Sequence, residues 1–174
     1  SSKRGNNVLS AGLLQECAEH RSLSRKGQID LGVALARSGQ VHEALGVFRK
    51  IEKDGQACPL TLNNIGMMLA AEGRPIEALD YCRRALDREQ AISCLWDSMG
   101  FVQFKLKHYQ EAELHLLKAV ELEPQFPDAW RHLLHVYHQS GQAEKLAKTR
   151  SRVGYYLPEE LKRFEREKDQ ELSE

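Results

Sequence analysis

The residues best suited to chemistry are an aspartate and three histidines in one short stretch: Asp128, His132, His135 and His138. On an α-helix, which turns by about 100° per residue, these side chains share one arc of the surface. His132 and His135 are then close enough to bind one metal ion, but two histidines on one helix make a weak site without ligands from elsewhere. We favour the alternative, a polar ligand-facing surface whose histidine charge is tuned near neutral pH. We predict no metal and no cofactor.

Catalytic sequence motifs are absent. The chain has no Gly-x-Ser-x-Gly, no glycine-rich phosphate loop, no His-Glu-x-x-His and no kinase signature. Neighbouring carboxylates such as Glu111 and Glu113 fall on predicted exposed helix surface, where solvated charge is the default. We predict that the chain is not an enzyme and has no catalytic residue.

Composition narrows the range of partners. The charges of the 25 basic and 25 acidic residues cancel, so the composition gives no indication of nucleic-acid binding. A local basic cluster at 145–152 is interpreted as a solvated helix face. The longest apolar run, 65–71, is too short to cross a membrane. Four cysteines without a Cys-x-x-Cys pair, and no signal sequence at the start, favour a cytoplasmic protein. The missing initiator Met suggests a piece of a longer protein.

A repeat of 34 residues predicts the elements that position these side chains. Gly32, Gly66 and Gly100 are 34 residues apart, and a small residue follows each of them after twelve positions, at Ala44, Ala78 and Ala112. Within each block, apolar residues recur at the helical period, and turn residues divide the block into two helices. A single helix pair cannot bury its apolar face, so neighbouring pairs must stack to make a core.

The pattern resembles the tetratricopeptide repeat (TPR) family, whose motif runs W-x2-L-G-x2-Y, then A, F, A and P. Residues 93–126 match this motif with Trp96, Met99-Gly100, Ala112, Ala119 and Pro124. Residues 127–157 match it with Trp130, Leu133 and Tyr137, although Leu134 stands where Gly is usual. The resemblance implies an all-α, right-handed superhelical solenoid of antiparallel helix pairs, with four TPR motifs plus flanking helices.

The expected organisation follows the repeat. We expect TPR 1 over 25–58, TPR 2 over 59–92, TPR 3 over 93–126 and TPR 4 over 127–157. Residues 1–8 are expected to be a disordered tail and residues 9–24 an N-terminal helix or partial repeat. Pro158 opens a charged segment over 158–174, which is expected to be a C-terminal capping helix. Gly32, Gly66 and Gly100 are expected to let a neighbouring helix approach closely.

In TPR proteins the first helix of each pair lines a concave groove. By position, this resemblance implies a peptide-binding groove formed by Ile29, Val33, Asn63, Asn64, Met67, Asp97, Phe101, Arg131, His132 and His135. Asn64 is the most specific of these because its amide could pair with a peptide unit of an extended ligand, although it could also be an ordinary surface residue. Phe101 would be the aromatic anchor. Contact with the adjacent helix is an equal alternative for Ile29, Val33, Met67 and Phe101.

The carboxylate clamp that some TPR proteins use for chaperone tails is not matched. It requires Lys and Asn on the first helix of the array, where this chain has Ile29 and Val33, and Lys and Arg on the third, where it has Cys94 and Ser98. A frame shifted by one repeat also fails. The C-terminal tails of Hsp70 and Hsp90 are therefore not the expected ligands.

These observations predict a protein-protein interaction scaffold that binds a partner peptide or helix in the concave groove, without catalysis. Two alternatives stay open. The chain could self-associate through its convex face or an incomplete N-terminal repeat, or it could be the TPR domain of a larger enzyme that presents substrate.

Overall fold

The computed structural model describes residues 23–171, and all of their regular secondary structure is α-helical. The predicted tail over 1–8 lies outside the described residues, as does the predicted N-terminal helix over 9–24 except for Leu23 and Ser24. The chain divides into two compact units, one up to Arg88 and one from Glu89 onward, and each is described by itself. The predicted all-α fold is confirmed for the described residues.

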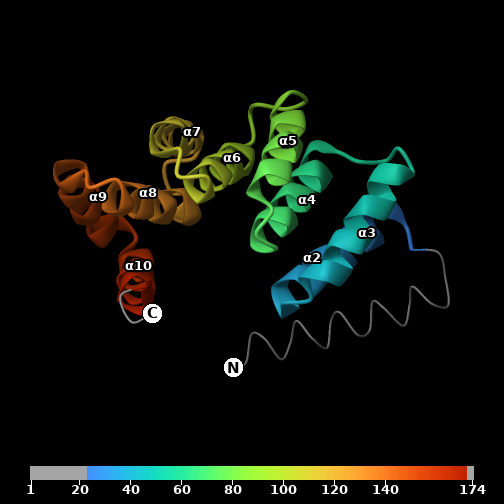
Figure 1. Cartoon of the computed structure of the whole chain (residues 1–174), viewed down its shortest axis with the longest axis horizontal. Helices are drawn as coiled ribbons and strands as arrows, with labels where there is room; N and C mark the ends of the chain where they lie inside the picture. Colours follow the sequence, from blue (N-terminus) through green and yellow to red (C-terminus); the bar gives the residue numbers. More distant parts are fainter. Residues whose placement is uncertain (1–22, 172–174) are drawn as a thin grey trace. The chain divides into compact units, whose positions relative to one another are not determined.

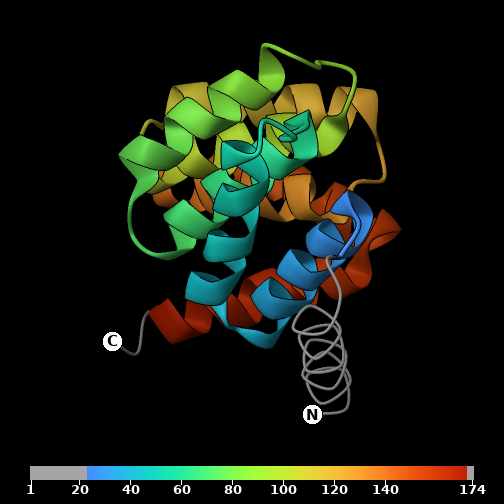
Figure 2. The same cartoon turned by 90° about the vertical axis from the view of Figure 1, so that its right-hand side faces the viewer.

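The first unit contains two antiparallel helix pairs. The first pair is α2 (Arg25–Ser38) with α3 (Val41–Lys53), and the second is α4 (Pro59–Ala71) with α5 (Pro75–Leu86). The partners within each pair pack against each other, and both α2 and α3 also contact α4, so the second pair stacks on the first. These pairs run from blue to green in Figures 1 and 2.

The second unit repeats this arrangement and extends it by one helix. It comprises α6 (Ser93–Lys105), α7 (Tyr109–Leu122), α8 (Pro127–Gln139), α9 (Ala143–Tyr156) and α10 (Pro158–Glu171). Both α6 and α7 contact α8, and in the same way both α8 and α9 contact α10. The last helix, red in Figure 1, therefore takes the place that the first helix of a following pair would take.

Local sequence signals account for the helix boundaries. Proline occupies the first helical position of α4, α5 and α8, where its missing N–H would have no intrahelical partner. The turn inside a pair contains a glycine with a positive φ, as at Gly39 (88°) and Gly141 (71°). The turn between α6 and α7 uses Lys107 at the same repeat position with φ 62°, a left-handed conformation that is costly for a residue with a Cβ.

Three glycines bring the two helices of a pair into close contact. A Cβ built on Gly32 would lie 2.6 Å from the Phe48 ring, and one on Gly100 would lie 2.6 Å from Cγ of Leu116. At Gly66 the nearest atom is Sγ of Cys82 at 2.9 Å. As expected, these glycines let the two helices approach closely. Side chains of the second helix pack against the backbone of the first and leave no room for a methyl group.

In α10 the corresponding position carries a charge. Glu165 follows Pro158 by the same seven positions that separate Gly66 from Pro59. Its carboxylate pairs with Nη2 of Arg150 at 2.6 Å and with Nζ of Lys168 at 2.9 Å. The neighbouring residue of α10, Phe164, is completely buried in the core of the unit. The helix thus contacts α8 and α9 through both apolar and charged side chains, and it carries a carboxylate at the position where α2, α4 and α6 have a glycine.

We predict that Gly100→Ala lowers the free energy of unfolding by about 1–3 kcal/mol, because the added methyl group meets Leu116 and the backbone oxygen of Ala112. Gly46→Ala is the matched control, since this exposed helical glycine in α3 has no atom within 4 Å of its would-be Cβ. It should instead raise stability by about 0.5–1 kcal/mol. Urea unfolding of the full chain measures both changes, and equal effects would contradict the close packing.

Candidate functional site

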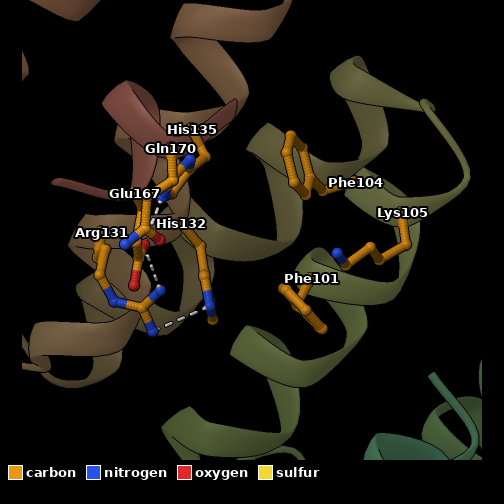
Figure 3. Close-up of a pocket in the computed structure, with 8 residues that line it drawn as sticks. All are labelled: Phe101, Phe104, Lys105, Arg131, His132, His135, Glu167 and Gln170. Carbon is orange, nitrogen blue, oxygen red and sulfur yellow. Dashed lines mark hydrogen bonds and ion pairs between the residues drawn. The ribbon is translucent and has the colours of Figure 1, made fainter. Parts of the chain in front are cut away.

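A cavity of about 370 Å³ opens between α6, α8 and α10 in the second unit. It is lined by Phe101, Phe104, Lys105, Arg131, His132, His135, Glu167 and Gln170 (Figure 3). The aromatic residues and the lysine come from one wall, and most of the hydrogen-bonding groups come from the other. The cavity therefore offers an apolar side and a polar side to one ligand.

The α6 wall is formed by residues at positions i, i+3 and i+4, which share one helix face. Phe101 and Phe104 are half-buried, while Lys105 is exposed. The Lys105 ammonium lies 5.3 Å from the centre of the Phe101 ring, within the range of a cation–π contact. The Phe101 ring also lies against His132, with ring centres 4.8 Å apart. Both aromatic rings keep part of their surface open toward the cavity.

His132 is held between two charged groups. Its Nδ1 lies 2.7 Å from Oδ1 of Asp97, and both side chains are only 8% exposed. Its Nε2 lies 3.3 Å from Nη2 of Arg131. Because a guanidinium can only donate, Nε2 must be the acceptor and Nδ1–H the donor to Asp97. The hydrogen bonds thus fit a neutral imidazole whose two nitrogens are both engaged.

Arg131 is the centre of an ion-pair cluster that joins α8 to α10. Its side chain is 11% exposed and pairs with Asp128 at 2.6 Å and with Glu160 and Glu167 at 3.5 Å each. Glu167 also accepts a hydrogen bond from Nε2 of His135 at 2.9 Å. The two acidic side chains of α10 therefore surround the guanidinium of α8.

The ion-pair cluster lowers the pKa of two of its carboxylates, those of Glu167 and Asp128. Burial alone would raise the pKa of Glu167, but the His135 hydrogen bond, the Arg131 charge and a hydrogen bond from Arg163 together hold that pKa below its usual value. Burial would likewise raise the pKa of Asp128, and its hydrogen bond and charge pairing with Arg131 lower it overall. Both carboxylates are ionised in the native protein at neutral pH.

The second unit places its predicted groove residues in two environments. Phe101, Arg131, His132 and His135 all line the cavity. Taken as whole residues, His132 and His135 are nevertheless only 7% exposed, and Asp97 is only 6% exposed. All three were expected to face a ligand. The difference arises because α6 packs on one side of α8 and α10 covers the other.

The first unit carries the remaining predicted residues. Ile29 and Val33 on α2 are half-buried, as are Asn64 and Met67 on α4. Asn63 was expected to face the groove but is 6% exposed, and its Oδ1 has no hydrogen-bond partner among the described residues. The Asn64 amide makes no hydrogen bond within the described part of the chain. No described residue therefore occupies its donor or acceptor groups.

Four residues that line the cavity are not among the groove residues named from the sequence: Phe104, Lys105, Glu167 and Gln170. Phe104 could have been found from its spacing, because it follows Phe101 by one helical turn. Glu167 and Gln170 depend on where α10 packs. The sequence signal for that packing is Pro158, which begins α10 as Pro127 begins α8. Treating the segment as another first helix would have placed it against α8.

For the metal site that the sequence left as an alternative, the described residues supply no third ligand beside His132 and His135. Within residues 23–171 there is no group of three His, Cys, Asp or Glu side chains placed to hold one ion. His132 and His135 point to different carboxylates, Asp97 and Glu167. Each histidine thus already has a hydrogen-bond partner of its own.

The basic cluster on α9 is largely neutralised. Lys145 pairs with Glu113 at 2.6 Å, Lys148 with Glu144 at 2.6 Å, and Arg150 with Glu165. The Arg152 guanidinium lies 4.5 Å from the Trp130 ring centre. These contacts fit the interpretation as a solvated helix face. None of the helices in the described part of the chain is both long and apolar enough to cross a bilayer.

Comparison with known proteins identifies the class of fold. Stacked antiparallel helix pairs with close-packed glycines define an α-helical repeat protein. Residues 60–92 and residues 95–126 each match a family model described as tetratricopeptide repeat. These two segments of the chain are tetratricopeptide repeats, and the fold class of the chain is that of the TPR solenoids. No curated protein matches it by sequence.

Solved structures show the same fold. TTC0263 from Thermus thermophilus, a thermophilic TPR protein, superposes with a TM-score of 0.80 at 16% identity, covering 92% of this chain and 89% of that one. MamA (41-end) from Desulfovibrio magneticus RS-1 gives 0.70 at 20% identity, covering 96% and 90%. YrrB, described as a TPR protein with an unusual peptide-binding site, gives 0.66 at 18%, covering 90% and 81%. At these identities the similarity shows the fold alone, and together with the repeat matches it supports a protein-protein interaction scaffold.

We predict that acid weakens the packing of α10 on α8. The pKa of Glu167 is lower in the folded chain than in the unfolded chain, where a Glu has a pKa of about 4.3. At a pH above this unfolded value, the ionised carboxylate stabilises the fold. This stabilisation is lost as the pH falls through the pKa of the folded chain. The urea midpoint should therefore fall between neutral pH and about pH 3. Glu167→Gln should be less stable than the native chain at pH 7 and show a smaller fall. Glu111→Gln, at an exposed position on α7, is the control and should keep the native slope.

Proposed function

We propose that the chain is an interaction scaffold that binds a partner peptide on the first helices of its repeats, with the cavity between α6, α8 and α10 as a principal contact. This proposal rests on Phe101, a half-buried aromatic residue that lines the cavity. The polar groups beside it are held in place by hydrogen bonds and ion pairs. Aromatic side chains of this kind are typical anchors of binding interfaces. The TPR fold adds support, because its repeats commonly bind other proteins.

The cavity favours binding over chemistry. None of its lining residues is a serine, threonine or cysteine that could act as a nucleophile. His132, the residue closest in type to a general base, has both ring nitrogens engaged by Asp97 and Arg131. We therefore propose a site that holds its ligand without a catalytic step.

The first unit offers a second contact of a different kind. The Asn64 amide on α4 has no hydrogen-bond partner among residues 23–171, and it can donate to and accept from the same peptide unit of an extended ligand. Half-buried Met67 lies one turn further along the helix, where it could contact an apolar side chain. Within the first unit, these residues and Ile29 and Val33 form a proposed peptide-binding surface of their own.

We further propose that the protein acts in the cytoplasm. Its three described cysteines, Cys58, Cys82 and Cys94, are free thiols. Cys82 is completely buried, and desolvation raises the pKa of its thiol to about 12, so it stays protonated and unreactive. Free thiols of this kind fit a reducing compartment.

Phe101→Ala should abolish or strongly reduce partner capture from a cell extract, while leaving the helical content unchanged. Truncating an aromatic anchor typically costs about 2 kcal/mol or more of binding free energy. Asn64→Ala should weaken capture less, because it removes hydrogen bonds and little apolar area. Quantitative mass spectrometry of the bound proteins, with the full chain as bait, measures both effects.

Leu114→Ala provides the control for this experiment. Leu114 is 67% exposed on α7 and does not line the cavity, so its removal should leave capture unchanged. If Phe101→Ala and Asn64→Ala both retain every partner that the native chain captures, the proposed binding surface is wrong.

Self-association is a second candidate function, favoured by two adjacent exposed aromatic residues at the end of α9. Tyr155 is 79% exposed and Tyr156 66% exposed. Tyrosine is enriched at protein interfaces. If these residues form a self-interface, sedimentation velocity should show a concentration-dependent larger species that disappears in the Tyr155→Ser/Tyr156→Ser double variant. A single monomeric species at every concentration would exclude this candidate.

A further inference from the structure

The chemistry of the ligand can be inferred from which groups of the cavity are already used within the protein. The two histidines and Arg131 each have a carboxylate partner on α6, α8 or α10. Glu167 accepts from His135 and from Nε of Arg163, the latter at 3.0 Å. These groups therefore shape the wall but have little hydrogen-bonding capacity left for a ligand.

Lys105 is the charged group of the cavity that remains available. Its ammonium contacts the face of Phe101 but pairs with no carboxylate of the described residues. Gln170, which is exposed at the other side of the cavity, likewise has no side-chain hydrogen bond within residues 23–171. As far as residues 23–171 are concerned, the cavity thus presents one positive charge without a carboxylate partner and one amide without a hydrogen-bond partner.

An apolar surface lies directly beside this charge. Phe101 and Phe104 both line the cavity, and Lys105 follows Phe104 immediately on the same helix. A ligand that reaches the ammonium must therefore also lie against the two rings. A volume of about 370 Å³ is enough for one or two side chains of a peptide but not for a packed helix.

We propose that this cavity binds an acidic peptide in which an aromatic or large aliphatic side chain lies next to an aspartate or glutamate. The apolar side chain packs against Phe101 and Phe104, and the neighbouring side-chain carboxylate pairs with Lys105. We assign the carboxylate to a side chain within the peptide, because the ammonium lies beside the two rings and a side chain next to the apolar residue can reach it while the peptide continues past the cavity. This inference rests on the proposed peptide-binding function and specifies its ligand.

The proposal is tested with three fluorescein-labelled peptides that are acetylated and amidated at their ends and share one Gly/Ser frame. Their central residues are Glu-Phe-Glu, Gln-Phe-Gln or Lys-Phe-Lys. Fluorescence anisotropy with the full chain should give a Kd for the Glu peptide about two- to five-fold lower than for the Gln peptide, the range expected of one exposed ion pair. The Lys peptide should bind most weakly, and added salt should reduce these differences.

Substitutions of exposed lysines test whether the preference for the Glu peptide depends on the charge of Lys105 or on the overall charge of the protein. Lys105→Gln should remove the preference for the Glu peptide, and Lys105→Glu should reverse it in favour of the Lys peptide. Lys148→Gln is the matched control, since this exposed lysine on α9 does not line the cavity, and it should leave the preference intact. A Glu peptide with a free C-terminal carboxylate should bind no more tightly than the amidated one.

Equal Kd values for the Glu and Gln peptides, no binding of the Glu peptide, or a preference that survives in Lys105→Gln would each overturn the inference. Tighter binding of the free-carboxylate peptide would also overturn it, because the terminus would then be the source of the charge. The proposed peptide-binding function stands or falls separately, by whether Phe101→Ala or Asn64→Ala loses partners that the native chain captures.

Discussion

The close approach of the two helices at Gly32, Gly66 and Gly100 is the constraint on which the rest of the structure depends. Side chains of the second helix, Phe48 and Leu116 among them, pack against the bare backbone of the first. This packing fixes the orientation of each first helix in its pair. Because the proposed binding residues lie on the first helices, their positions depend on contacts made on the other side of those helices.

The packing of α10 changes what α8 can offer to a ligand. In an array ending at α9, the polar face of α8 with Arg131 and His135 would be open. Instead, Glu160 and Glu167 of α10 pair with Arg131, and Phe164 packs edge-on against the His135 ring at 4.9 Å between ring centres. The ion pairs are partly shielded from water, so losing one partner leaves a charge poorly compensated. The same helix also builds one side of the cavity, and it is therefore part of the candidate site.

The fold class followed from the sequence because a repeat displays each structural requirement several times. A glycine every 34 residues, with helical spacing between, is hard to reconcile with any other architecture. The spacing also placed Phe101 and Arg131 on faces that the structure brings together. It did not predict that His132 and His135 are buried, because this depends on Asp97 and Glu167, which lie 35 and 32 residues away in the chain. Helical periodicity specifies a face, but long-range packing determines whether that face is open.

Glu165 has a consequence for how such an array can grow. Repeat proteins lengthen by adding helix pairs that stack on their neighbours, and three of the pairs described above have a glycine where their two helices meet. At that position α10 carries a carboxylate that is paired with Arg150 and Lys168. A second helix placed against α10 would have to bury this ion-paired group. A pair inserted before α10 would leave this ion-paired group unchanged, so the array could lengthen at that point without any change in α10.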